Sequence, residues 1–380
     1  MSLCVAFTGG GTGGHIYPGL AVADQLRLIC KETKSENCRI VWIGSSSGMD
    51  KRIVEASGSA DLFYGIPSGK LRRYFSFKNI IDIFKIFGGF VKAFFILKKE
   101  KPQVLFSKGG FVSVPPCFAA KLLKIPVYTH ECDFSPGLAT KLNSKVAKGI
   151  FVSYQQTENF FGAEKKSKVM VTGNPVRPAF YNASPEKGRT FLGLPSIPEA
   201  QEKPLLVVIG GSSGAKQINQ LVAETLDFLC QHFILVHQTG AALAEDIKNL
   251  SPTQGIYKPY PFIYEEMPDV LAAADLVLSR AGANSIWECT VLQKPMILIP
   301  LCGSGTRGDQ VENAKFFANH QAALVLEGKE ATKENLIALV TKMIEKEERE
   351  KLIKGAASLC TGTPPAKRIA THIYSEINKK

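Results

Sequence analysis

Two glycine-rich turns, one in each half of the chain, constrain its fold more than any other sequence feature. The first turn, Gly9–His15, follows the apolar run Leu3–Thr8, and the second, Gly210–Ala215, follows the apolar run Leu205–Ile209. Each run is typical of a buried parallel strand that leads through a turn into a helix. Glycine lets a ligand approach the backbone closely, and a helix N-terminus offers N–H groups to an anion. The two turns predict twin nucleotide-binding-type domains with a cleft between them.

Further apolar runs alternate with helical patterns in both halves, which predicts an α/β fold with parallel sheets. In the first half they are Arg39–Ile43, Leu62–Ile66, Gln103–Phe106, Val127–Thr129, Gly149–Val152 and Val169–Val171. In the second half they are Phe233–Val236, Gly255–Lys258, Leu276–Leu278, Met296–Ile299 and Ala323–Leu326.

The length of 380 residues suits two such domains. We expect residues 1–173 to form the first domain and 205–361 the second. Residues 174–204, rich in proline, glycine and charge, are expected to be a linker and the start of the second domain. Residues 362–380 are expected to form a helix that could pack back on the first domain.

Composition narrows the class of protein. The nine cysteines include no Cys-x-x-Cys pair, which is typical of free thiols in a reducing compartment. We find no signal-peptide pattern and no apolar stretch long enough to span a bilayer. The net charge of +12 favours an acidic partner.

The segment Leu71–Lys99 combines many aromatic and aliphatic residues with an excess of basic ones. Lys78, Lys85, Lys92 and Lys99 recur every seven residues, which places them on one side of a helix. A core helix whose lysine stems reach solvent explains part of this pattern. The surplus of aromatics favours an additional role at an anionic lipid surface. Nucleic acid is not expected as a partner, because no binding fold or stacking platform is evident.

Polar residues follow several predicted strands of the first half, at the sheet edge where ligands bind in this architecture. His15 precedes a predicted helix and could act as a general base or contact an oxyanion. Glu131 and Asp133 are expected at the same edge. Arg177 could form two parallel hydrogen bonds with a diphosphate, although a surface salt bridge is the ordinary alternative.

The second half carries its clearest binding pattern in residues 279–288. Gly282 ends a strand, so that N–H groups near Ala283 and Asn284 could hold a phosphate. Glu288 lies far enough into the helix to accept both hydroxyls of a ribose. Asp309 and Gln310 could bind sugar hydroxyls. We find no metal-ligand spacing, no Asp-x-Asp pair and no P-loop, so neither a metal nor a cofactor is expected.

Six of these segments, in this order, resemble the lipid II-forming N-acetylglucosaminyltransferases of bacterial cell-wall synthesis (the MurG family). They are Gly10–His15, Gly109–Ser113, His130-Glu131, Gly173–Arg177, Gly210–Ala215 and Ala281–Glu288. The resemblance implies two Rossmann-like domains whose parallel sheets face a central cleft, the GT-B arrangement. It implies inverting transfer of GlcNAc from UDP-GlcNAc to the C4 hydroxyl of MurNAc in undecaprenyl-pyrophosphoryl-MurNAc-pentapeptide. A peripheral location on the cytoplasmic face of the plasma membrane would follow.

The resemblance also implies residue roles. His15 and Glu131 would be catalytic, and the acceptor would contact Gly13, Gly14, His15, Gly109, Gly110 and Phe111. The donor would contact Thr12, Gly13, Gly14, Asp133, Arg177, Ser212, Tyr264, Ala283, Asn284, Ser285, Ile286, Trp287, Glu288 and Gln310. Phe111, Asp133 and Asp309 stand where tyrosine, asparagine and glutamine are common in the family, which leaves their local contacts open.

Two other enzyme classes, and a non-catalytic binder of a lipid-linked sugar, remain alternatives at this stage. Another GT-B glycolipid glycosyltransferase would share the donor site but not the Gly10–His15 turn with Glu131. A UDP-GlcNAc 2-epimerase uses a similar double-Rossmann cleft without an acceptor, and the basic aromatic segment argues against it.

Overall fold

A computed structural model describes residues 3–33, 38–69, 77–195, 203–211, 214–241, 247, 250–303, 306–360 and 362–379, with the side chains of 77–81 left out. The chain forms two compact units. Unit 1 comprises Met1–Arg177 together with Thr363–Lys380, and unit 2 comprises Pro178–Gly362. The first unit therefore extends four residues past the boundary expected at Gly173.

Unit 1 is built on a seven-stranded, all-parallel sheet in the order β3-β2-β1-β4-β5-β6-β7. Its strands are β1 (Leu3–Thr8), β2 (Cys38–Ser45), β3 (Leu62–Ile66), β4 (Val104–Ser107), β5 (Val127–Glu131), β6 (Gly149–Val152) and β7 (Val169–Val171). The strand order reverses beside β1, so the crevice at the carboxyl ends of β1 and β4 is where this architecture binds ligands.

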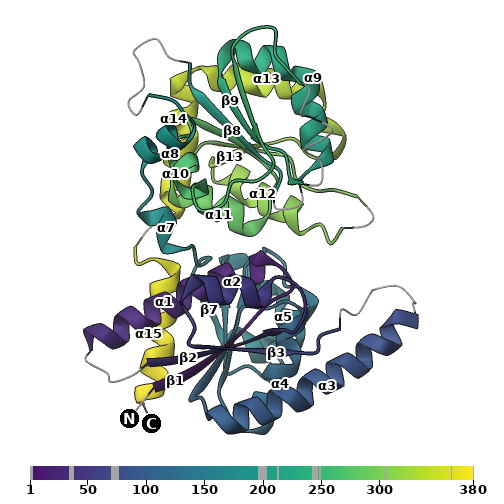
Figure 1. Cartoon of the computed structure of the whole chain (residues 1–380), viewed down its shortest axis with the longest axis vertical. Coiled ribbons are helices and arrows are strands. Elements are labelled where there is room, and N and C mark those ends of the chain that lie inside the picture. The colour runs from purple at the N-terminus through teal and green to yellow at the C-terminus, as the bar shows by residue number, and fades with distance from the viewer. Residues whose placement is uncertain are drawn as a thin grey trace. The chain divides into compact units, whose positions relative to one another are not determined.

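Helices cover both faces of this sheet (Figure 1). They are α1 (Tyr17–Glu32), α2 (Asp50–Ser57), α3 (Phe77–Glu100), α4 (Val114–Leu122), α5 (Leu138–Asn143), α6 (Ala163–Lys166) and α15 (Pro365–Asn378). Successive side chains of β1 point to opposite faces of the sheet and contribute to two hydrophobic cores. Val5 and Phe7 belong to the cluster under α1 and α15, and Ala6 belongs to the cluster under α3 and α4.

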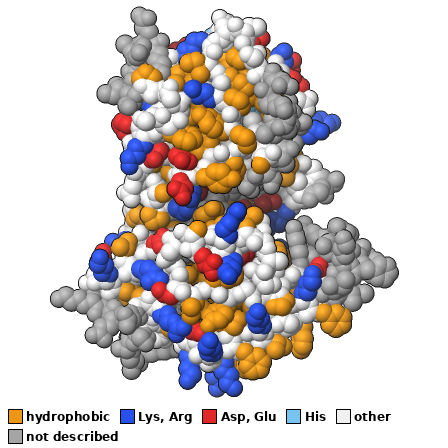
Figure 2. Space-filling model, viewed as in Figure 1, with side chains coloured by type: hydrophobic (Ala, Val, Ile, Leu, Met, Phe, Trp, Pro, Cys, Tyr) orange, Lys and Arg blue, Asp and Glu red, His pale blue; other side chains and the backbone are white. Residues whose placement is uncertain are grey.

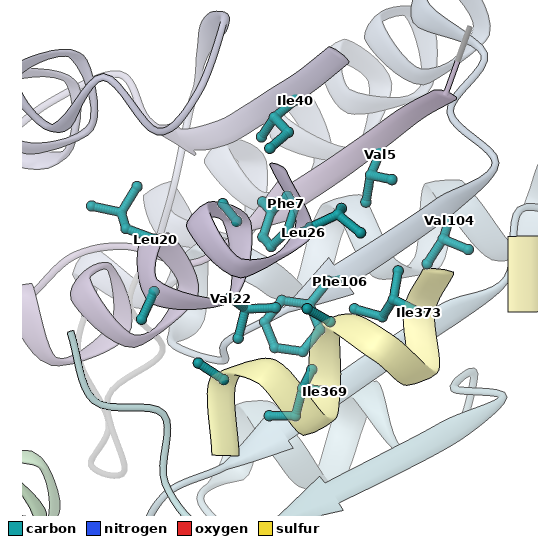
Figure 3. Close-up of a cluster of buried hydrophobic side chains, with 14 of the residues drawn as sticks. Val5, Phe7, Leu20, Val22, Leu26, Ile40, Val104, Phe106, Ile369 and Ile373 are labelled. Atoms are coloured by element: carbon teal, nitrogen blue, oxygen red, sulfur yellow. The ribbon is translucent and has the colours of Figure 1, made fainter. Parts of the chain in front are cut away.

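The C-terminal helix α15 completes the first of these cores. Ile369 and Ile373 are fully buried and pack in the same cluster as Phe7, Leu26 and Phe106, as Figure 3 shows. The hydroxyl of Tyr128 on β5 donates to Glu376 at 2.8 Å. Residues from the two ends of the described chain thus share one hydrophobic core.

Unit 2 is built on a six-stranded parallel sheet in the order β10-β9-β8-β11-β12-β13. Its strands are β8 (Leu205–Ile209), β9 (Ile234–Gln238), β10 (Ile256–Tyr260), β11 (Leu276–Ser279), β12 (Met296–Leu298) and β13 (Ala323–Val325). Its helices are α7 (Pro178–Tyr181), α8 (Pro185–Phe191), α9 (Lys216–His232), α10 (Met267–Ala273), α11 (Ala283–Val291), α12 (Asp309–Asn319), α13 (Lys333–Ile344) and α14 (Lys346–Leu359).

The α/β class and the two parallel sheets predicted from the sequence are confirmed, and every strand lies within two residues of its expected bounds. Pro136 lies just outside a helix, because α5 begins at Leu138 after Gly137. Within the described residues, no helix combines the length and hydropathy that crossing a bilayer requires.

Candidate functional site

The glycine turn after β1 is held in place by a buried carboxylate. Asp50, the first residue of α2, accepts hydrogen bonds from the N–H of Gly11 at 3.0 Å and of Ser45 at 2.8 Å. Burial raises the pKa of Asp50, while these N–H donors lower it. A Cβ on Gly10 would lie only 1.8 Å from Asp50 Oδ2, so glycine is required there. Asp50 was not among the residues expected at the site, because its only signal in the sequence is its place at a helix start after β2.

His15 lies against the second glycine turn of unit 1. It ends a short 3₁₀ turn, Gly13–His15, and a Cβ on Gly110 would lie 2.9 Å from its Cδ2 atom. Gly109 and Gly110 have φ values of 89° and 78°, which favour glycine. The ring of Phe111 packs on Gly11 so closely that a Cβ there would lie 2.5 Å from Cε1. The structure therefore brings together the residues that the sequence assigned to the acceptor.

Glu131, expected to be catalytic, is bound by its own loop. Its Oε1 accepts from the N–H groups of Cys132 at 2.9 Å and Asp133 at 3.1 Å, and its Oε2 accepts from Gly137 at 2.9 Å. The side chain is 5% exposed. Both oxygens hold the loop between β5 and α5. The geometry therefore favours a positioning role for Glu131 rather than a role as general base.

One group of potential metal ligands comes together among the described residues, in that same loop. Ligand-type atoms of Glu131, Cys132 and Asp133 lie within 4.8 Å of one another. The Glu131 oxygens are engaged by backbone N–H groups, and burial raises the pKa of the Cys132 thiol to about 12, which disfavours the thiolate that a metal needs. The residues present do not fit a resident metal ion, and metal independence stays a prediction.

Arg177, the last residue of unit 1, lies beside the first glycine turn. Its guanidinium stacks on the ring of Tyr17 with 4.7 Å between the carbon and the ring centroid, and a Cβ on Gly13 would lie 3.1 Å from the same ring. The stacking orients the planar guanidinium, which suits two parallel hydrogen bonds to a phosphate. Thr12 is exposed in the same turn.

In unit 2, the N-terminus of α11 forms a second candidate anion site. Gly282 caps the helix, and the first backbone N–H that bonds back to it belongs to Ile286. The N–H groups of Ala283, Asn284 and Ser285 therefore have no acceptor within the helix. A Cβ on Gly282 would meet nothing within 4 Å, so the approach to this end is open within the described residues. Glu288 is half-buried farther along the helix.

Two residues expected to bind the donor are core residues instead. Ile286 is 1% exposed and Trp287 is 5% exposed, and the Trp287 ring packs edge-on against Phe317 at 5.3 Å. They point inward because they lie three and four residues after the buried Ala283, and residues at these spacings share one face of a helix. Their side chains are therefore buried in the core of unit 2, and the expectation of a donor contact rests for this segment on its backbone N-terminus and Glu288.

The other residues expected to bind the donor differ in the contacts that they already make. Gln310 Oε1 accepts from the N–H of Leu301 at 2.9 Å, which leaves its amide nitrogen to donate. Tyr264 is 71% exposed, and its ring packs on Phe262 at 4.5 Å. Ser212 lies outside the described residues.

A buried network positions the loop that carries Tyr264. The carboxamide oxygen of Gln238, at the end of β9, accepts from the N–H of Ile263 at 3.0 Å. Beside it on β9, His237 contacts Tyr257 Oη and Asn219 Oδ1, each at 3.1 Å. Burial lowers the pKa of His237 to about 4, so the ring is neutral at neutral pH.

Helix α3 carries a separate surface, which we call the α3 stripe: Ile83, Phe84, Phe87, Val91 and Phe95. Their exposed fractions are 56%, 72%, 66%, 37% and 62%. The spacing places them along one side of the helix, and Lys85, Lys92 and Lys99 run along its edge. Figure 2 shows hydrophobic side chains gathered at the lower edge of unit 1, over α3. The side chains of Lys70, Arg72, Arg73 and Lys78 lie outside the described residues.

Comparison with known proteins decides the family. A domain model described as the glycosyltransferase family 28 N-terminal domain matches residues 5–152, and the corresponding C-terminal domain matches residues 205–370. A curated UDP-N-acetylglucosamine–N-acetylmuramyl-(pentapeptide) pyrophosphoryl-undecaprenol N-acetylglucosamine transferase of Treponema denticola is 51% identical over 99% of this chain and 98% of its own length. The chain belongs to this transferase family. It is therefore a glycosyltransferase, as the resemblance implied.

Further relatives of this transferase family agree. A Bacillus cereus transferase of the same name is 40% identical over 97% of this chain and 98% of its own. The crystal structure of Acinetobacter baumannii MurG superposes with a TM-score of 0.73 and 26% identity, covering all of both chains.

A UDP-GlcNAc 2-epimerase of Neisseria meningitidis, solved with UDP-GlcNAc bound, has a TM-score of 0.66 with full coverage of both chains at only 15% identity. That likeness reflects the shared fold alone.

Proposed function

We propose that this transferase moves GlcNAc from UDP-GlcNAc to the C4 hydroxyl of MurNAc in undecaprenyl-pyrophosphoryl-MurNAc-pentapeptide, with inversion, in peptidoglycan synthesis. The observation that carries the proposal is the 51% identity through both units to a relative whose name states this donor and acceptor. Both substrates carry a diphosphate, and each unit offers a glycine turn or helix N-terminus suited to an anion.

The test is release of UDP from UDP-GlcNAc in the presence of a lipid I analogue, with the two product sugars identified by mass. UDP release should require both substrates. Conversion of UDP-GlcNAc alone would indicate an epimerase, and release with diacylglycerol in place of lipid I would indicate another glycolipid transferase. Either result would refute the proposed acceptor.

Donor recognition is proposed for unit 2. The N–H groups at the start of α11 would bind a phosphate of UDP, and Glu288 would accept hydrogen bonds from the ribose hydroxyls. The Gln310 amide would donate to GlcNAc, and the Tyr264 backbone would face uracil. Arg177 would add a guanidinium to the diphosphate, whose charge grows as UDP leaves. The reaction would then need no metal ion.

Acceptor recognition is proposed for the turns of unit 1. His15 is our candidate for the general base, because histidine is the side chain whose ordinary pKa lies nearest neutral pH and its ring lies over Gly110. It would take the proton from the attacking C4 hydroxyl as the glycosidic bond forms and UDP departs. Glu131 would hold the loop that carries Asp133, which could accept from a sugar hydroxyl.

Membrane docking is proposed for the α3 stripe. The lipid-linked acceptor stays in the bilayer, so the enzyme must reach the headgroups. Exposed aromatic side chains flanked by lysines suit the interface of an anionic leaflet. A peripheral location on the cytoplasmic face of the plasma membrane is therefore part of the proposal.

A further inference from the structure

Unit 1 buries a lysine side chain that forms no ion pair among the described residues. Lys108 follows β4 directly and is 1% exposed; its Nζ atom has no nitrogen or oxygen partner among the described residues, and the Cys132 thiol is its neighbour. No carboxylate of the described residues lies within the 4.0 Å of an ion pair with it. An isolated buried ammonium destabilises the folded state. A contribution of this charge to ligand binding would explain why the residue is buried here.

The neutral groups around Lys108 offer no counter-charge. Burial lowers the pKa of His130 well below its ordinary value, and the nearby Lys108 ammonium lowers it further. Burial raises the pKa of the Cys132 thiol to about 12, although Lys108 lowers it in part. Both side chains are therefore uncharged at neutral pH. The Glu131 and Asp133 carboxylates belong to the same loop, and the Glu131 oxygens accept from three backbone N–H groups.

The place of Lys108 indicates where a counter-charge would come from. Its backbone N–H bonds to the carbonyl of Thr8 at 2.8 Å, so it lies at the carboxyl ends of the adjacent strands β1 and β4. Its Cβ lies 3.2 Å from the position a Cβ on Gly9 would take, and Gly109 follows it directly. Both glycine turns of unit 1 thus border this residue. Ligands bind at this edge in such sheets.

We propose that Lys108 supplies the positive charge by which unit 1 attracts the diphosphate of the lipid-linked acceptor, acting through space across the glycine turns. This step rests on the proposed function. The low dielectric of the surroundings makes such an interaction stronger than one between exposed groups. The diphosphate of UDP is the other source of the same chemistry, and the test separates the two.

The variant is Lys108→Met, which keeps the length of the side chain and removes its charge. The matched control is Lys168→Met, which removes an exposed charge from the same unit. We expect the KM for a soluble lipid I analogue to rise by about tenfold or more in Lys108→Met, with the KM for UDP-GlcNAc unchanged. A rise in the KM for UDP-GlcNAc alone would assign the charge to the donor and overturn the proposal.

Thermal melting without substrates gives a readout that needs no activity. Removing an unpaired buried charge should raise the melting temperature of Lys108→Met, whereas removing a structural contact would lower it. With saturating UDP present, inorganic pyrophosphate should stabilise wild type and Lys168→Met more than Lys108→Met. Equal stabilisation of all three, or a lowered melting temperature with unchanged KM values, would refute the role of Lys108. Lack of transfer by wild type with a preserved pyrophosphate difference would refute the proposed reaction alone.

Discussion

Replacing Phe87 by serine tests the α3 stripe as a membrane-docking surface. The Phe87 side chain is 66% exposed near the middle of the stripe. Fully burying a phenylalanine side chain contributes about 1.5–3 kcal/mol, so burying the exposed two-thirds in lipid would contribute about 1–2 kcal/mol. Losing that contribution should lower partitioning onto vesicles by roughly five- to thirtyfold.

Co-sedimentation with vesicles of two compositions separates the apolar from the electrostatic contribution. Phe87→Ser should bind less well to both anionic and neutral vesicles. The variant Lys85→Glu with Lys92→Glu should bind less well to anionic vesicles only, since each basic residue contributes about 1 kcal/mol there and salt screens it. Leu28→Ser removes a 49%-exposed apolar side chain from α1 and serves as the control. Equal binding of Phe87→Ser, Leu28→Ser and wild type would refute the reasoning.

Three further predictions concern the two units. Glu288→Ala should weaken UDP binding by about 2–4 kcal/mol through the loss of two charge-assisted hydrogen bonds, and unchanged affinity by calorimetry would remove Glu288 from the ribose site. His15→Ala should lower kcat by ~10²–10⁴ with its melting temperature kept, whereas Glu131→Ala should lower the melting temperature as well; near-normal turnover of His15→Ala would move the base elsewhere. The pKa of His237 is about 4 when folded and 6.5 ordinarily, so the unfolded chain takes up its proton first as pH falls. The free energy of unfolding should therefore fall by on the order of 3 kcal/mol between pH 6.5 and pH 4. In His237→Gln, the free energy of unfolding measured with denaturant should depend less steeply on pH.

The strands were predictable from the sequence because both sheets are parallel and buried on both faces, so that each strand is a short apolar run between turn residues. The glycine turns were predictable for a related reason: positions such as Gly10 and Gly110 leave no room for a Cβ, and this requirement appears directly as residue type. The place of His15 beside Gly110 depends on the strand order, in which β1 and β4 are neighbours, and this order was not predicted from the sequence.

Side-chain roles were less predictable. Glu131 looked like a catalytic carboxylate, but its partners are three backbone N–H groups within the next six residues, and these contacts depend on the loop conformation, which the sequence does not show. Ile286 and Trp287 were taken with their whole segment, although their face of α11 is buried. Asp50 and Lys108 were missed because burial alone distinguishes them from ordinary surface charges.

The course of the chain makes unit 2 an insertion within unit 1. Residues 178–362 leave unit 1 after Arg177 and return to it at Thr363. During synthesis on the ribosome, the core that α15 completes therefore stays incomplete while the whole of unit 2 is made. Until then Phe7, Leu26 and Phe106 lack the cover that Ile369 and Ile373 provide. The nascent first unit carries an exposed apolar surface from the synthesis of Arg177 until α15 is made, and a premature stop anywhere before α15 leaves it permanently incomplete.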